Sequence, residues 1–208
     1  MSRKKPAMSS RDQILKSIRN QVVASVDHPG LAGDWIRYDD RVAHFATVLA
    51  AVGGAAHVVD TAEEIVAVLS KVPAFAQASK IVSLCEQISG NVDFVAIDDP
   101  HALEDVDFAV LPAQFAVAEN GAVWVDDAVV KHRVIYFIPQ HLSFIVRSPA
   151  DAADAIVDNM HLAYERISLG EPQFGAFVSG PSKTADIEQS LVIGAHGARS
   201  LNVFFLRQ

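Results

Sequence analysis

Short apolar runs without polar alternation are the feature that most constrains the fold of this chain. They lie at residues 56–60, 80–85, 93–97, 107–112, 141–147, 174–180 and 201–206. A strand that is apolar on both sides must be covered on both faces, which is typical of parallel sheets flanked by helices. Helical patterns separate several of these runs. We therefore predict an α/β fold, with three α/β/α layers and a mostly parallel sheet.

The helical segments are predicted from apolar stripes and from the residues that start or stop a helix. We expect helices at residues 9–27, 40–51, 63–71, 149–167 and 186–194. His28-Pro29-Gly30 is expected to stop the first, and Thr61 with Glu64 has the pattern of a capping box before the third. Residues 114–127 predict two extended segments joined at Asn120-Gly121. We expect residues 1–54 to be a helical lead-in and residues 55–208 to be one globular α/β domain.

Composition excludes several classes of protein and of site. The formal net charge of −8 and the sequence pI of about 5.4 argue against a nucleic-acid-binding face. No apolar run reaches the ~18 residues of a membrane span, and the basic N-terminus lacks the apolar region of a signal peptide. We therefore expect a cytoplasmic protein. A single cysteine, Cys85, rules out a cysteine-ligated cluster within this chain, and no metal site is expected from the histidine spacing.

The segment SGPSKTADIE, residues 179–188, has two interpretations. As a strand-to-helix loop, its Ser179-Gly180 turn and the Ser182-Lys183-Thr184 triplet would face the free amides of a helix that starts near Asp186. Such loops gather at the carboxyl ends of parallel strands and bind anions. Alternatively, the acidic residues only cap that helix, and no ligand is bound.

Two further stretches hold candidate functional residues. Glu119 follows an apolar strand and precedes the Asn120-Gly121 turn, so it is either a held catalytic base or nucleophile or a solvated acid beside a hairpin. His196-Gly197 follows the last predicted helix. A histidine there either donates to an anion or interacts with the carboxyl end of the helix.

These stretches together resemble a known family. SGPSKTADIE followed by GAHGAR, with AENG upstream, is similar to the signature of LUD-domain proteins, specifically the lactate utilization protein C group, over about residues 55–208. The resemblance implies a fold of the NagB/RpiA/CoA-transferase type. It also implies a non-redox subunit that supports oxidation of L-lactate to pyruvate with iron–sulfur partner proteins.

The resemblance implies a ligand site as well as partners. Its residues would be Ser179, Gly180, Ser182, Lys183, Thr184, His196 and Gly197, and its ligand a small carboxylate or phosphate. Two other functions remain open. Glu119-Asn120-Gly121 also resembles the active-site turn of class I CoA transferases, which would make Glu119 the nucleophile of a stand-alone enzyme. The third is a regulatory module that binds a small anion without turnover.

Overall fold

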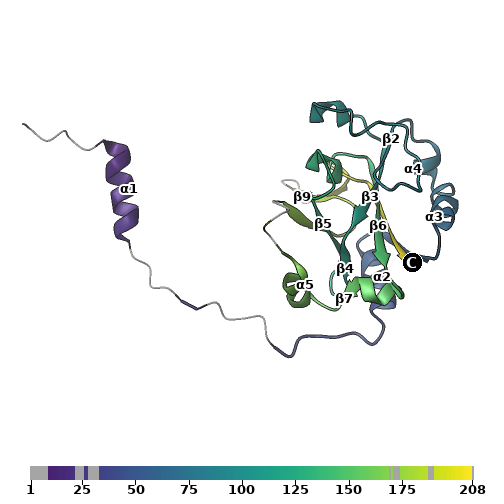
Figure 1. Ribbon diagram of the computed structural model, residues 1–208, viewed down its shortest axis with the longest axis horizontal. Coiled ribbons are helices and arrows are strands. Elements are labelled where there is room, and N and C mark those ends of the chain that lie inside the picture. The colour runs from purple at the N-terminus through teal and green to yellow at the C-terminus, as the bar shows by residue number, and fades with distance from the viewer. Residues whose placement is uncertain are drawn as a thin grey trace, which may run out of the picture. The chain divides into compact units, whose positions relative to one another are not determined.

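The computed structural model describes residues 9–21, 26–27, 33–168, 170, 174–186 and 190–207. The chain divides into two compact units, Met1–Gly33 and Asp34–Gln208. The first unit contains α1, Ser10–Asn20, whose first turn is capped by the Ser9 hydroxyl (Figure 1). The helix predicted at 9–27 is therefore too long at its carboxyl end. The predicted stop at residues 28–30 lies outside the described residues.

A five-stranded parallel sheet forms the centre of the second unit. Its strands follow the order β1-β11-β6-β3-β2, and every neighbouring pair is parallel. Their bounds are Ala55–Val59 (β1), Ile81–Ser83 (β2), Phe108–Ala113 (β3), His141–Ser148 (β6) and Ser200–Arg207 (β11). The predicted α/β class with a mostly parallel sheet is confirmed.

Both faces of this sheet are buried, as the apolar runs predicted. On β11, Val203 and Phe205 belong to one core, while Phe204 and Leu206 belong to the other. The first core includes the buried face of α2, Arg41–Ala51, and the second includes α3, Ala62–Leu69, with α4, Pro73–Ala76, packed at its side. The alternation along one strand thus supplies both cores.

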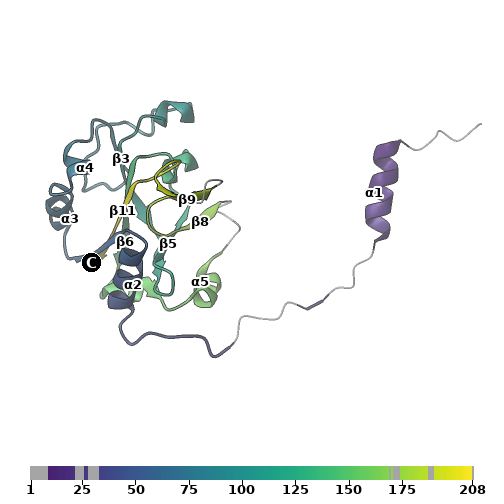
Figure 2. The same cartoon turned by 180° about the vertical axis from the view of Figure 1, so that it is seen from behind.

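A second sheet lies against the first core. It has the order β7-β4-β5-β8, and its strands are Phe115–Val117 (β4), Ala122–Asp126 (β5), Ile156–Val157 (β7) and Gly175–Val178 (β8). Its outer face packs on α5, Met160–Arg166, through Trp124 and Ala163. In Figures 1 and 2 the second sheet stands between α5 and the five-stranded sheet, with α3 and α4 beyond.

One predicted helix is interrupted by a strand. Residues 149–167 were expected to form a single helix, but they contain the 3₁₀ helix η3 (Ala152–Ala155), β7 and the short α5. Ile156 is fully buried and pairs with Ala116 of β4. The gain from burying this segment in the second sheet therefore outweighs its helical periodicity.

Two other predictions of secondary structure are wrong. Residues 93–97 form turns instead of a strand, since the Asp93 carboxylate accepts a hydrogen bond from the Ala96 amide at 3.2 Å. The helix expected at 186–194 is replaced by a hairpin of β9, Lys183–Asp186, and β10, Ser190–Ile193. Residues 183–186 and 190–193, which the structure describes, are strands, so the predicted helix amides are not found in either segment.

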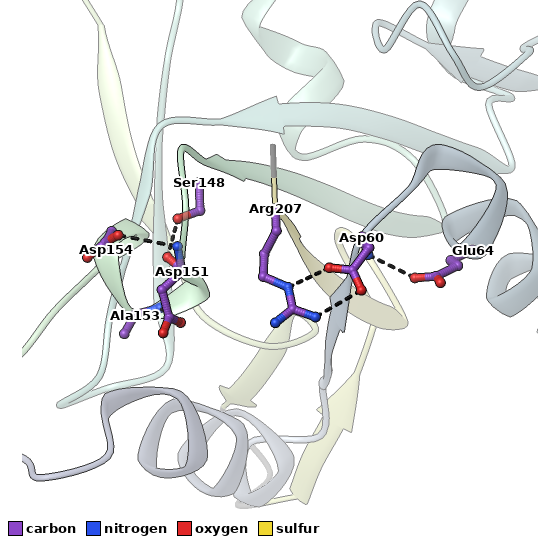
Figure 3. A network of polar contacts seen from close by, with 7 residues as sticks. All are labelled: Asp60, Glu64, Ser148, Asp151, Ala153, Asp154 and Arg207. Carbon is purple, nitrogen blue, oxygen red and sulfur yellow. Dashed lines mark hydrogen bonds and ion pairs between the residues drawn. The ribbon is translucent and has the colours of Figure 1, made fainter.

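Surface contacts join the carboxyl ends of β1 and β11 (Figure 3). Arg207 donates to both carboxylate oxygens of Asp60, at 2.6 and 3.0 Å, and joins β11 to the turn after β1. The Thr61 hydroxyl caps α3 as predicted, but Glu64 accepts from the Asp60 amide, one residue before the N-cap. An exposed ion pair of this kind contributes about 0–1 kcal/mol to the free energy of unfolding. The Arg207–Asp60 pair therefore positions the ends of the two strands more than it stabilises the fold.

We predict that Gly121→Ala destabilises the second unit. Gly121 forms the β4–β5 turn with φ of 64°, and an added Cβ would lie 2.9 Å from the Leu49 amide nitrogen of α2. A non-glycine residue in this conformation costs about 1–3 kcal/mol, which thermal unfolding measures as a lower Tm. Gly170→Ala is the matched control, because its Cβ would meet nothing within 4 Å. Equal melting temperatures for the two variants would contradict the assignment.

Candidate functional site

A cleft of about 410 Å³ collects most of the residues that the sequence singled out. We call it the first cleft. From the predicted site it contains Ser179, Gly180, Ser182, Lys183, His196 and Gly197. Apolar side chains complete its wall, among them Val52, Phe137, Leu142 and Phe177. Two segments that were separate in sequence, residues 179–183 and 196–198, therefore form one concave surface.

The first cleft does not lie where the topology predicted. Leu142 is the second residue of β6, and Ala198 lies two residues before β11, so the cleft adjoins the amino ends of these parallel strands. Residues 179–182 follow β8 of the second sheet and lead into β9. They are not a strand-to-helix loop at the carboxyl ends of the parallel sheet, and that prediction was wrong.

Hydrogen bonds hold the loop to its neighbours. The Ser179 hydroxyl donates to the Asn120 carbonyl at 2.7 Å, and the Ser182 hydroxyl donates to the His196 carbonyl at 3.0 Å. The Ser182 amide donates to the Ala198 carbonyl at 2.7 Å. The two hydroxyl protons are thus used within the protein, and they position the loop against residues 196–198 and the β4–β5 turn.

Gly180 allows the loop to approach α2 closely. Its φ is 68°, and an added Cβ would lie 2.8 Å from a methyl carbon of Val52 and 2.9 Å from the Val52 carbonyl. Any larger residue would have to push the loop away from the end of α2. Gly180 therefore sets the shape of the first cleft and need not touch a ligand.

Lys183 and His196 are the basic side chains of the first cleft, and both are exposed. Within the described part of the chain Lys183 forms no ion pair, and no aspartate or glutamate lines the cleft. The chain as a whole carries a net charge of −8, whereas Lys183 places a positive charge on the lining of this cleft. The cleft is suited to a small anion with an apolar portion.

Tyr136 closes the floor of the first cleft. Its ring is almost fully buried, and its hydroxyl donates to the Asp126 carbonyl at 2.8 Å. Burial, and then the negative charges of Asp126 and Asp127, raise the pKa of the Tyr136 hydroxyl well above its usual range. Tyr136 is therefore a neutral structural donor at ordinary pH.

Glu119 does not line the first cleft. Its carboxylate accepts a hydrogen bond from the Met160 amide at 2.8 Å, at the first residue of α5. The neighbouring Asn120 carbonyl reaches the loop through Ser179, but the Glu119 side chain is used to cap a helix. The β4–β5 turn thus contacts the loop of the first cleft through Asn120, while the Glu119 carboxylate points to α5.

The remaining predicted residue, Thr184, also lies outside the lining of the first cleft. It lies in β9 and pairs with Val192 of β10. Tyr136, Phe137 and Phe177 also line the first cleft and were not predicted from the sequence. No sequence motif marks these aromatic residues as ligand contacts. Their position beside predicted strands is the one feature that could have indicated them.

The residues that the structure describes contain no metal-binding cluster and no membrane-spanning helix. Among them, no three or more histidine, cysteine, aspartate or glutamate side chains are grouped so that they could hold a metal ion. None of the helices described here is both long and apolar enough to cross a membrane.

Comparison with known proteins supports the signature on which the site was predicted. The profile of the LUD domain matches residues 92–206, more than half of the chain. The chain belongs to the LUD-domain family. The predicted family resemblance is therefore confirmed.

Two curated relatives carry the same name. Lactate utilization protein C of Geobacillus sp. (strain WCH70) is 31% identical over 119 residues, which cover 51% of this chain and 47% of that protein. Lactate utilization protein C of Bacillus pumilus (strain SAFR-032) is 27% identical over 96 residues, 45% of this chain and 40% of that protein. The matches thus span less than half the length of these relatives.

A solved structure supports the fold. The crystal structure of a DUF162 family protein from Deinococcus radiodurans is similar with a TM-score of 0.53 at 20% identity. The match covers 80% of this chain and 96% of that chain. At this identity the likeness concerns the fold alone.

We predict that Glu119→Ala lowers stability through the loss of a helix cap. Removing a capping acceptor costs about 0.5–2 kcal/mol, and Glu119→Gln should keep most of it because an amide oxygen can accept the same bond. Thermal or urea unfolding measures the difference. Glu165→Ala, on the exposed side of α5, is the control. A fully stable Glu119→Ala protein would show that the contact with Met160 has no role in folding.

Proposed function

We propose that this chain is a non-redox subunit that supports oxidation of L-lactate to pyruvate together with iron–sulfur partner proteins. The observation that supports this most directly is the similarity to proteins named lactate utilization protein C, within a family whose domain spans residues 92–206. The oxidation removes two electrons and two protons from the substrate, and the electrons must pass to a redox centre.

The side chains of this protein argue for a redox centre in a partner. Iron–sulfur clusters are held by several cysteine thiolates, and this sequence has only Cys85. Cys85 is buried, and burial raises the pKa of its thiol to about 11, with the positive charge of Arg147 acting in the opposite direction. A neutral, enclosed thiol is a poor metal ligand.

The first cleft is the part of this subunit that we propose to bind a small carboxylate or phosphate. Lys183 and His196 would meet the charged group, and Phe137 and Phe177 would meet the apolar remainder. Ser179, Gly180, Ser182 and Gly197 would position the loop. Its volume lies within the range of about 300–1,000 Å³ that is usual for small-molecule sites.

The same cleft favours a second candidate function, a regulatory module that binds an anion without turnover. No described carboxylate lines the cleft, and both serine hydroxyls donate to backbone carbonyls. A nucleophile paired with a general base is the usual requirement for covalent catalysis. The stand-alone enzyme with Glu119 as nucleophile gains no support from this arrangement, since that carboxylate caps α5.

We predict that deletion of the gene impairs growth on L-lactate as sole carbon source but not on glucose. The tagged chain should also co-purify with proteins that contain iron and inorganic sulfide, measured by chemical analysis and by visible absorption. Re-expression of the intact chain is the control. Normal growth on lactate, together with purification free of iron–sulfur proteins, would contradict the proposed role.

We predict that Lys183→Met weakens anion binding in the first cleft about tenfold or more, because a charge-assisted hydrogen bond contributes about 1.5–3 kcal/mol. Binding of L-lactate, pyruvate and inorganic phosphate is measured by the shift in melting temperature. A ligand at 100 times its Kd stabilises the fold by about 2.7 kcal/mol.

Lys71→Met is the matched control for this experiment, since Lys71 is exposed beyond α3 and outside the first cleft. It should bind each anion as the original chain does. Absence of stabilisation by all three anions would remove both the anion site and the regulatory alternative, while leaving the growth experiment to decide the lactate role.

A further inference from the structure

A larger cleft of about 600 Å³ lies at the opposite end of the parallel sheet. We call it the second cleft. Its lining comes from the residues after β2, from the end of β3 and from the end of β6; Val129 is at its rim. The polar members are Glu86, Gln87, Gln114 and Arg147. In open α/β sheets, the carboxyl ends of the strands are where ligands usually bind.

The two clefts are separate sites. Leu142 of β6 lines the first and Arg147 lines the second, and five residues of strand span roughly 16 Å. Their odd spacing also sends the two side chains to opposite faces of the sheet. A ligand in the second cleft would therefore not touch Lys183.

Arg147 is the charged donor of the second cleft. Its Nη2 donates to the Gln87 side-chain oxygen at 3.1 Å, and this is its one hydrogen-bond partner among the described residues. Glu86 lies on the same rim, but no ion pair joins it to Arg147. A guanidinium has five N–H donors, so most of its fork remains available to a carboxylate or phosphate.

Gln87 and the backbone around it are held in place. The Leu84 amide donates to the Val110 carbonyl at 2.9 Å, and the Ile88 amide donates to the Cys85 carbonyl at 2.9 Å. The Cys85 amide donates to the Ser83 hydroxyl at 3.3 Å, which turns the chain at the end of β2. The residue that orients Arg147 therefore comes from a fixed turn and not from a free loop.

The rest of the second cleft is apolar. Leu84, Pro112, Ala113 and Ile145 line its walls, and Val129 leaves 60% of its surface exposed at the rim. Gln114 adds a neutral amide with both donor and acceptor groups. One cation beside an apolar wall is the arrangement that recognises an organic anion, where the head group pairs with the guanidinium and the body displaces water from the wall.

We propose that the second cleft binds an organic oxyanion, a carboxylate or phosphate monoester, with its charged group on Arg147 and its apolar body against Ile145 and Pro112. This site is distinct from the first cleft and does not depend on the role in lactate oxidation. Gln87 is a positioning residue, which holds the guanidinium toward the ligand.

The chain offers a local reporter for this site. Cys85 lines the second cleft and is the single cysteine of the sequence, so labelling with ¹⁵N-cysteine gives one amide resonance from the cleft itself. Benzoate and phenyl phosphate are the probes, since each carries an aromatic ring that shifts nearby resonances. Benzyl alcohol is their uncharged counterpart.

We expect the Cys85 resonance to move saturably with at least one of the two anions at concentrations up to about 10 mM, and not with benzyl alcohol. The anion that acts identifies the head group as carboxylate or phosphate. Arg147→Met should weaken this binding about tenfold or more, equivalent to about 1.4 kcal/mol, while Arg147→Lys should retain part of it. Lys183→Met, which changes only the first cleft, should leave the titration unchanged.

Arg11→Met on α1 is the control for the loss of one positive charge, and it should titrate as the original chain does. Arg147 is exposed, so its variants are expected to fold, and their melting temperatures check this. A resonance that stays in place with both anions would overturn the proposal, as would equal affinity in the Arg147→Met chain or equal response to benzyl alcohol.

Discussion

The insertion of β11 between β1 and β6 is the constraint on which the rest of the second unit depends. The last described strand of the chain occupies an inner position of the sheet and is parallel to both neighbours. Phe204 and Phe205 point to opposite faces and are both fully buried, so neither core is complete before this strand is in place. Residues 196–198, shortly before β11, line the first cleft, where Ser182 donates to the His196 and Ala198 carbonyls.

Elements whose residues are buried on both faces could be predicted from the sequence, because such runs have few alternatives. The runs that became β3, β6 and β11 belong to this group. At residues 149–167 the sequence does not reveal that pairing with a distant strand is more favourable than the helix that the local apolar periodicity predicts. There Ile156 pairs with β4, while Asp158 and Asn159 bind the segment before α2, through the Tyr38 amide and the Ile36 carbonyl. These partners are distant in sequence, so no local pattern indicates them. The apolar stripe alone therefore predicted a helix where the chain forms a strand.

The sequence indicated which residues come together in the first cleft, but it indicated the wrong local structure around them. Six of the seven residues predicted for the ligand site line the first cleft, but the predicted helix terminus is replaced at residues 183–186 by β9. The small residues and hydroxyls of SGPSKTADIE instead allow this loop to pack closely on its neighbours. Gly180 packs on Val52, and the Ser179 and Ser182 hydroxyls donate to the carbonyls of segments distant in sequence. The same residue types favour helix caps and tight loops, so composition alone could not separate the two.

The side chains that line the two clefts are suited to the binding of anions. The first cleft is lined by a lysine and a histidine, and the second by an arginine and two glutamine amides. Oxidation of a hydroxy acid also needs an acceptor for two electrons, and the one cysteine here is enclosed with a raised pKa. Cationic groups beside apolar walls hold anions in place without taking their electrons. In the proposed role, a subunit of this kind would contribute recognition and position, and the electron transfer would fall to the proposed iron–sulfur partners.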